Sequence, residues 1–131
     1  MKQIIVTRKK KLAGAWVPFW IISSDVRDRM AARFQTVDEV QLDLHGHPRP
    51  SLHIQMLNEI GTCIRSGETV TVTLEDRVSE IYAVTMDGIL SNRVMLINGI
   101  TVGDAETFRF TLTAKGGFRR PCYPLLLPES L

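Results

Sequence analysis

The strictest pattern in this 131-residue chain is the alternation Thr-Val-Thr-Val-Thr-Leu at residues 69–74. Side chains two residues apart on a β-strand point to the same side. The run therefore predicts a strand with Val70, Val72 and Leu74 turned inward and three threonines turned outward. Threonine suits the wet face of a sheet, because its branched side chain fits the pleat and its hydroxyl tolerates water. This part of the chain should belong to a sheet with one buried face.

Comparable short apolar runs recur along most of the chain, with turn residues between them. Asp87-Gly88 and Asn98-Gly99 are typical of tight hairpin turns, because these residues accept positive φ angles. Pro18 cannot donate to a strand ladder, so the strand that contains it should lie at an edge or carry a bulge. With 69–74 included, strands are predicted at 4–6, 15–23, 40–44, 52–56, 81–86, 89–97, 100–102 and 108–112.

A helix is predicted only near residues 25–35, where Val26, Met30 and Phe34 form one apolar stripe after a Ser24-Asp25 cap. A parallel α/β fold needs a helix between most strands, and this chain offers one. We therefore expect an all-β fold. The pattern favours an antiparallel β-sandwich or jelly-roll-like barrel of about eight or nine strands with one short helix inserted.

The chain is expected to form one domain over residues 1–120, followed by a proline-rich apolar arm at 121–131. Three prolines exclude a helix or a central strand in the arm. Its apolar side chains need cover, either from the protein's own core or from a neighbouring subunit. Both arrangements remain open from the sequence.

Composition narrows the class of protein. A hydrophobic share of 44% and a charged share of 23% argue against disorder, and a net charge of +2 gives no overall footprint for nucleic acid. The two cysteines, Cys63 and Cys122, fit no metal or redox spacing. A bridge between them stays open, but we expect a reduced, cytoplasmic protein.

The basic residues 9–11 and the apolar stretch 12–22 superficially copy a secretory signal. Eleven residues are too few to span a bilayer as a helix, which takes about 20. Pro18 and the tryptophans also suit a cleaved signal helix poorly. We interpret the stretch as a buried strand and expect no membrane span.

All three histidines, His45, His47 and His53, fall in one window. On a strand, His45 and His47 would face the same side and could bind one divalent transition metal, with His53 supplied by the next strand. The pair resembles the His-x-His motif of cupin barrels, which hold a metal inside a β-sandwich. The glutamate that follows in cupins is missing here, and no histidine follows His53. Surface histidines in a polar loop are the alternative.

Catalytic signatures are otherwise scarce. The carboxylate pairs Asp38-Glu39 and Glu75-Asp76 are adjacent in sequence, so on a strand their members point to opposite faces and are not placed around one reacting bond. The chain has no Gly-x-Ser-x-Gly elbow, phosphate loop or dinucleotide fingerprint. We predict no catalytic residues and no bound cofactor, with the histidine metal site as the alternative.

Two basic clusters, residues 8–11 and Arg119-Arg120, could engage phosphate or an anionic membrane if the fold brings them together. Lysines at the end of an edge strand also have the ordinary role of discouraging edge-to-edge association. Nucleic-acid binding is therefore the less favoured interpretation.

The stretch Ile60-Gly61, Ser66-Gly67-Glu68 and the alternating run to Leu74 resembles small bacterial β-sandwich modules of the PEGA type. The opening residues 1–20 are similar to the first hairpin of small bacterial proteins of that build. Such modules usually carry a second glycine after the strand, where this chain has Arg77-Val78-Ser79. The resemblance implies a role in assembly or interaction and supplies no catalytic residue.

The favoured interpretation is a non-enzymatic binding or scaffold module. It would contact a protein partner, or a second copy of itself, through an aromatic N-terminal edge and the apolar arm. The candidate partner-binding residues are Trp16, Trp20, Tyr123, Leu125, Leu126 and Leu127.

Overall fold

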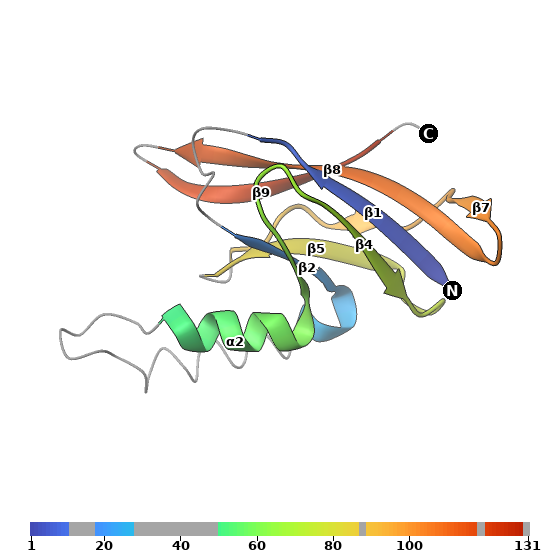
Figure 1. The fold of residues 1–131 in the computed structure, drawn as a ribbon, viewed down its shortest axis with the longest axis horizontal. Helices are drawn as coiled ribbons and strands as arrows, with labels where there is room; N and C mark the ends of the chain where they lie inside the picture. Colours follow the sequence, from blue (N-terminus) through green and yellow to red (C-terminus); the bar gives the residue numbers. More distant parts are fainter. Residues whose placement is uncertain (11–17, 28–49, 87–88, 118–119, 130–131) are drawn as a thin grey trace.

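A computed structural model describes residues 1–10, 18–27, 50–86, 89–117 and 120–129. These residues form mostly strands in two sheets, so the predicted all-β class is confirmed (Figure 1). The elements are β1 (Lys2–Arg8), β2 (Phe19–Ser23), α2 (Pro50–Ile60), β3 (Thr62–Ile64), β4 (Thr69–Leu74), β5 (Glu80–Thr85), β6 (Val94–Met95), β7 (Ile100–Val102), β8 (Ala105–Gly117) and β9 (Arg120–Pro128).

The first sheet has the order β4-β1-β8. On the side of β8 away from β1, the beginning of β8 pairs with β7 and the rest of it pairs with β9. β4 alternates as predicted, with its valines and Leu74 packed against the core and its threonines exposed. β1 and β8 run parallel, so the expectation of purely antiparallel pairing is wrong at this position. The chain passes through the second sheet between them, which supplies the long connection that parallel pairing needs.

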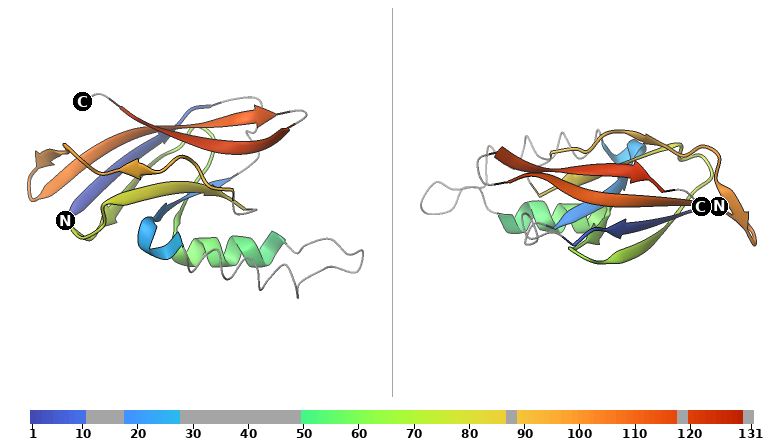
Figure 2. Two further views of the ribbon diagram at one scale, coloured as in Figure 1. Left: turned by 180° about the vertical axis from the view of Figure 1, so that it is seen from behind. Right: turned by 90° about the horizontal axis from the view of Figure 1, so that it is seen from above.

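The second sheet has the order β3-β2-β5-β6, and its central strands are buried on both faces. Phe19, Ile21, Ile81 and Ala83 face the first sheet and share a core with it. Trp20, Ile22, Tyr82 and Val84 face the other way and pack with Met56 and Leu57 of α2. The described chain therefore has three layers, with the second sheet between the first sheet and α2 (Figures 1 and 2).

The strand predicted at 52–56 is wrong, because Pro50–Ile60 is the helix α2. Three alternating apolar residues are too few to separate a strand from a helix. Met56, Leu57 and Ile60 instead follow helical spacing and meet the second sheet. Pro50 opens the helix, a position where its missing N–H costs nothing. α2 is thus helical in addition to residues 24–27, which are helical as predicted. The rest of the predicted 25–35 helix lies outside the described residues.

The expectations for the strand near Pro18, for the strand 89–97 and for the hairpin turns also need correction. The strand around Pro18 is internal, since β2 lies between β3 and β5; Pro18 precedes the strand and removes no ladder hydrogen bond. The predicted strand 89–97 shortens to β6 and a bridge at Leu90. Asn98 has a φ of 59°, the positive value predicted for the Asn98-Gly99 pair, but the tight hairpin turn lies at Gly103-Asp104 between β7 and β8, where Gly103 has a φ of 63°. The predicted strand 40–44 and the Asp87-Gly88 turn lie outside the described residues.

The proline-rich arm forms β9, which pairs antiparallel with β8. The amide of Glu129 donates to the carbonyl of Arg109, so odd-numbered residues of β9 direct their backbone groups toward β8. The backbone nitrogens of Pro124 and Pro128 therefore face away from β8, where a missing N–H breaks no ladder bond. Leu126 is fully buried in the core between the sheets.

The outward backbone groups of Leu126 are bound by a side chain. The carboxamide of Asn92 accepts from the Leu126 amide at 2.9 Å and donates to the Leu126 carbonyl at 2.8 Å. Asn92 follows the bridge residue Leu90 on the way to β6, so these bonds attach the arm to the second sheet.

A buried arginine joins the two sheets at one end. Arg8 of β1 is 2% exposed, donates from Nη1 to the carbonyl of Ile64 in β3, and lies 4.1 Å from the ring centroid of Phe19 in β2. A buried guanidinium needs such partners, because burial removes its water.

Leu126→Ala should lower the free energy of unfolding by roughly 2–5 kcal/mol, because it leaves a cavity between the sheets. Leu127→Ala, one residue away and 46% exposed, should change that free energy by no more than about 0.5 kcal/mol. Urea unfolding of both variants measures the difference. Equal effects would show that the arm does not dock as described.

Candidate binding surface

Four exposed apolar side chains lie on one short stretch of the chain, between β6 and the end of β7. Met95 is 52% exposed and Ile97 64%, and they are followed by Ile100 at 49% and Val102 at 61%. They belong to one stretch of chain that leaves β6 in the second sheet and enters β7 in the first. We call these four residues the apolar edge. Several exposed apolar side chains on one stretch of chain indicate an interaction site more strongly than a single exposed side chain does.

A pocket of about 390 Å³ opens beside the apolar edge, and we call it the edge pocket. Its volume lies within the range of small-ligand sites. It lies between the stretch 92–99 on one side and β8 with the end of β9 on the other. The lining residues are Asn92, Arg93, Val94, Met95, Ile97, Asn98, Gly99, Thr107, Phe108, Arg109, Phe110, Pro128 and Glu129.

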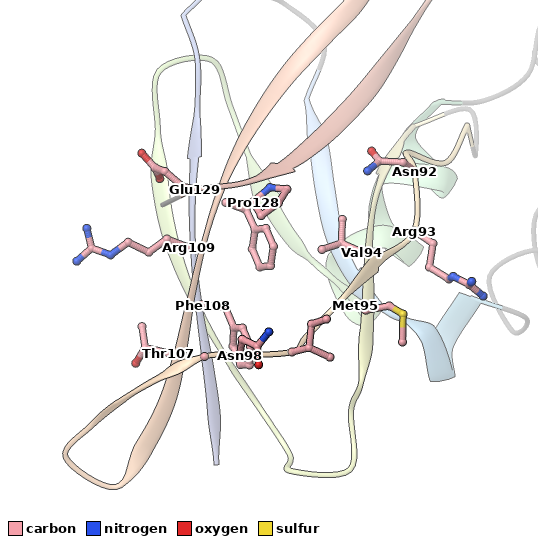
Figure 3. A pocket seen from close by; sticks show the side chains of 13 residues that line it. Asn92, Arg93, Val94, Met95, Asn98, Thr107, Phe108, Arg109, Pro128 and Glu129 are labelled. Atoms are coloured by element: carbon pink, nitrogen blue, oxygen red, sulfur yellow. The ribbon is translucent and has the colours of Figure 1, made fainter. Parts of the chain in front are cut away.

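The edge pocket exposes part of the core between the sheets. Val94, Phe108 and Phe110 line it and also belong to that core. Figure 3 shows Val94 and Pro128 pointing into the space, whereas Arg93 and Arg109 point away on opposite sides. The pocket therefore offers an apolar floor with charges at its margins. Such a site can accept an apolar side chain or a small apolar group and has no evident reactive centre.

The predicted partner-binding residues separate into two groups in the arm. Tyr123 and Leu127 are 45% and 46% exposed, and they share the outer face of β9 with the half-buried Leu125. Leu126 points to the opposite face and is buried. Its side chain is not accessible to a partner in this structure, because adjacent residues on a strand face opposite sides.

Trp20 is also interior. It is 1% exposed between β2 and α2, and its indole Nε1 donates to Asn58 Oδ1 at 2.9 Å. The prediction assumed an edge strand, but an internal strand between two cores has no free face. Trp16 lies outside the described residues.

Only one of the three histidines of the predicted metal site lies among the described residues. His53 belongs to α2 instead of the strand on which the metal-site prediction relied. His45 and His47 lie outside the described residues. Among the residues that the structure describes, no cluster of three or more His, Cys, Asp or Glu side chains could hold a metal ion. The metal site therefore stays a prediction from sequence.

The carboxylates at 75–76 sit in a surface turn, which the amide of Val78 closes by donating to the Glu75 carbonyl. Arg77 pairs with Glu75 and with Asp25, and the N-terminal amino group pairs with Asp76. The hydrogen bond from Ser23, followed by Arg77, lowers the pKa of Asp25. Each of these contacts favours the charged form, which suits a surface ion cluster better than a general acid. The pair Asp38-Glu39 lies outside the described residues.

The fold brings basic residues to one end of the molecule. The amide of Lys9 donates to the carbonyl of Leu112, and farther along β8 Gly117 pairs with Arg120. The exposed Lys9, Lys10 and Lys115 thus lie toward the same end of the first sheet. The apolar edge lies elsewhere, along the β7 side of β8.

Sequence patterns did not reveal the apolar edge. Val94 to Ile97 and Ile100 to Val102 looked like buried strands, since apolar runs carry no mark that separates core from exposed surface. The only available signal was that four consecutive apolar residues, 94–97, fit no alternation. In the structure, Val94 and Leu96 are buried, whereas Met95 and Ile97 are exposed.

Comparison with known proteins assigns no family. No family model matches the chain, and no curated protein matches it either. In the described residues, no helix is long and apolar enough to cross a membrane.

The pKa of Asp25 should lie below its ordinary value of 3.8, and Ser23→Ala or Arg77→Ala should raise it. Because the folded-state pKa is lowered, the ion cluster stabilises the fold above the unfolded-state pKa, and that contribution is lost as pH falls through the folded value. An NMR titration of the carboxyl carbon measures the shift. Arg93→Ala serves as the control. An Asp25 pKa that stays unchanged in both Ser23→Ala and Arg77→Ala would contradict the assignment.

Proposed function

We propose that this chain is a non-enzymatic β-sandwich module that mediates protein–protein association. The observation that carries the proposal is the apolar edge beside the edge pocket. The two facing sheets with a common core support the sandwich form of eight or nine strands that the sequence favours. The exposed outer face of β9, with Tyr123 and Leu127, would add a second contact area.

The form of the pocket supports binding to an apolar group of a partner. Its floor is made of core side chains, so an inserted side chain would remove apolar surface from water on both molecules. Arg93 and Arg109 point away from it on opposite sides and place charged groups at its margins, outside the apolar floor. An apolar centre with a polar margin is the usual anatomy of a protein interface.

The charged groups of the described chain give less support to catalysis. Catalytic acids and bases usually have pKa values pulled toward neutrality in a cleft. The shifts at Asp25, Asp76 and Arg77 go the other way and arise from surface partners. This contrast favours a binding role over a catalytic one, and the cytoplasm remains the expected compartment.

A photo-crosslinking amino acid at position 97 should trap a partner in cells that produce the chain. The matched control carries the same amino acid at Thr71, which is exposed on β4 at the other edge of the first sheet. Gel electrophoresis and mass spectrometry would identify the adducts. We expect a protein adduct from position 97 that is missing from position 71. Identical adduct patterns from both positions would overturn the proposal.

A further inference from the structure

The strand β7 is unusually exposed for part of a sheet. All three of its residues, Ile100, Thr101 and Val102, are exposed, although two are apolar and β-branched. Figures 1 and 2 show β7 and the adjoining part of β8 extending past the end of the second sheet. Native edge strands are commonly guarded by a charge, a proline or a bulge. Residues 97–103 contain no charged residue and no proline.

The pairing pattern fixes which backbone groups of β7 are free. Glu106 donates its amide to the carbonyl of Met1, so its backbone groups face the β1 side of β8. In an antiparallel pair, the residue opposite such a position directs its own N–H and C=O outward. That residue is Thr101. No described residue bonds the outward N–H and C=O of Thr101.

We propose that the outer edge of β7 pairs with β7 of a second copy of this chain, antiparallel and across a two-fold axis at Thr101. This inference rests on the proposed association function and names its partner. The amide of each Thr101 would donate to the carbonyl of the other, which closes one reciprocal pair of hydrogen bonds. The first sheets of the two copies would then form one continuous sheet.

The two-fold arrangement matches the side chains without conflict. Ile100 of each copy would face Val102 of the other, and apolar β-branched pairs of this kind stabilise neighbouring strands. The chain leaves the strand conformation at both ends, at Asn98 with a φ of 59° and at Gly103 with a φ of 63°, so the pairing involves only Ile100, Thr101 and Val102. These three side chains are uncharged, so no like charges meet across the axis. A two-fold interface needs a patch that complements itself in this way.

The attachment of β7 to its own sheet is firm enough to present this edge. A Cβ atom added at Gly99 would lie 2.6 Å from Glu106 Cγ and 2.7 Å from Phe108 Cζ, so the chain enters β7 in close contact with β8. The turn at Gly103 then returns the chain into β8. All three residues of the strand are thus paired with β8, and its other edge is left for a partner.

The first test is Thr101→Pro in the full chain, followed by sedimentation velocity over a range of protein concentrations. Proline removes the outward N–H of Thr101 but no bond to β8. Because both reciprocal hydrogen bonds are lost, the dimer dissociation constant should rise about tenfold or more. Thr101→Val keeps the amide and the branched shape, and its dissociation constant should stay within about twofold of the parent value.

A second pair of variants tests the register without proline. In Ile100→Lys/Val102→Glu, opposite charges face each other across the axis, whereas in Ile100→Glu/Val102→Glu like charges do. Both variants replace the same two side chains. The Lys/Glu variant should still dimerise, and the Glu/Glu variant should be monomeric at every concentration tested. Circular dichroism and urea unfolding confirm that each variant folds.

The outcomes separate this inference from the proposed function. A parent chain that stays monomeric at about 1 mM overturns pairing between copies, and the adducts from position 97 then decide whether other proteins bind. A dimer that is unaffected by Thr101→Pro, or equally weakened by both double variants, overturns the β7 pairing but leaves association intact.

Discussion

The apolar side chains on both faces of β2 and β5 are the constraint on which the structure depends. A sheet with two apolar faces must be covered twice, here by the first sheet on one side and by α2 on the other. The chain provides the first cover from β1 at its beginning, β4 in its middle, and β8 and β9 toward its end. It provides the second from the segment between β2 and β3. Arg8 then bonds the first cover to the middle layer at one end, through Ile64 and Phe19.

Alternation of polar and apolar residues predicted strands correctly where one face of the strand is exposed to water and the other is buried. Thr69 to Leu74 is the clearest case, because burial alternates residue by residue as the sequence does. The prediction was wrong at Leu52 to Met56, since a run of three alternating residues is too short to identify a strand. The packed face of the helix is formed by Met56, Leu57 and Ile60, and its contacts are with Trp20 and Tyr82, far away in the chain. The internal position of β2 was equally hidden, because a proline before a strand and a proline within it look alike in sequence.

The candidate binding surface was less predictable than the fold. Burial of Trp20 and exposure of Ile97 depend on which elements lie opposite them, and hydrophobicity alone gives both residues the same expectation. Tyr123 and Leu127 are exposed on the arm, whereas Leu126 between them faces the core, an outcome set by the register with β8. Local patterns thus predicted elements, and long-range pairing decided which of their faces water reaches.

The carboxamide of Asn92 takes the place of a further strand beside β9. One side chain supplies one acceptor and one donor to the backbone of Leu126, as a neighbouring strand would, and offers nothing on which a further strand could build. At Leu126 of β9 the outward backbone groups are therefore bound by a side chain. At Thr101 of β7, on the same side of β8, no described residue binds them. β7 offers only three residues to a further strand, a length that suits a reversible contact better than a fibre.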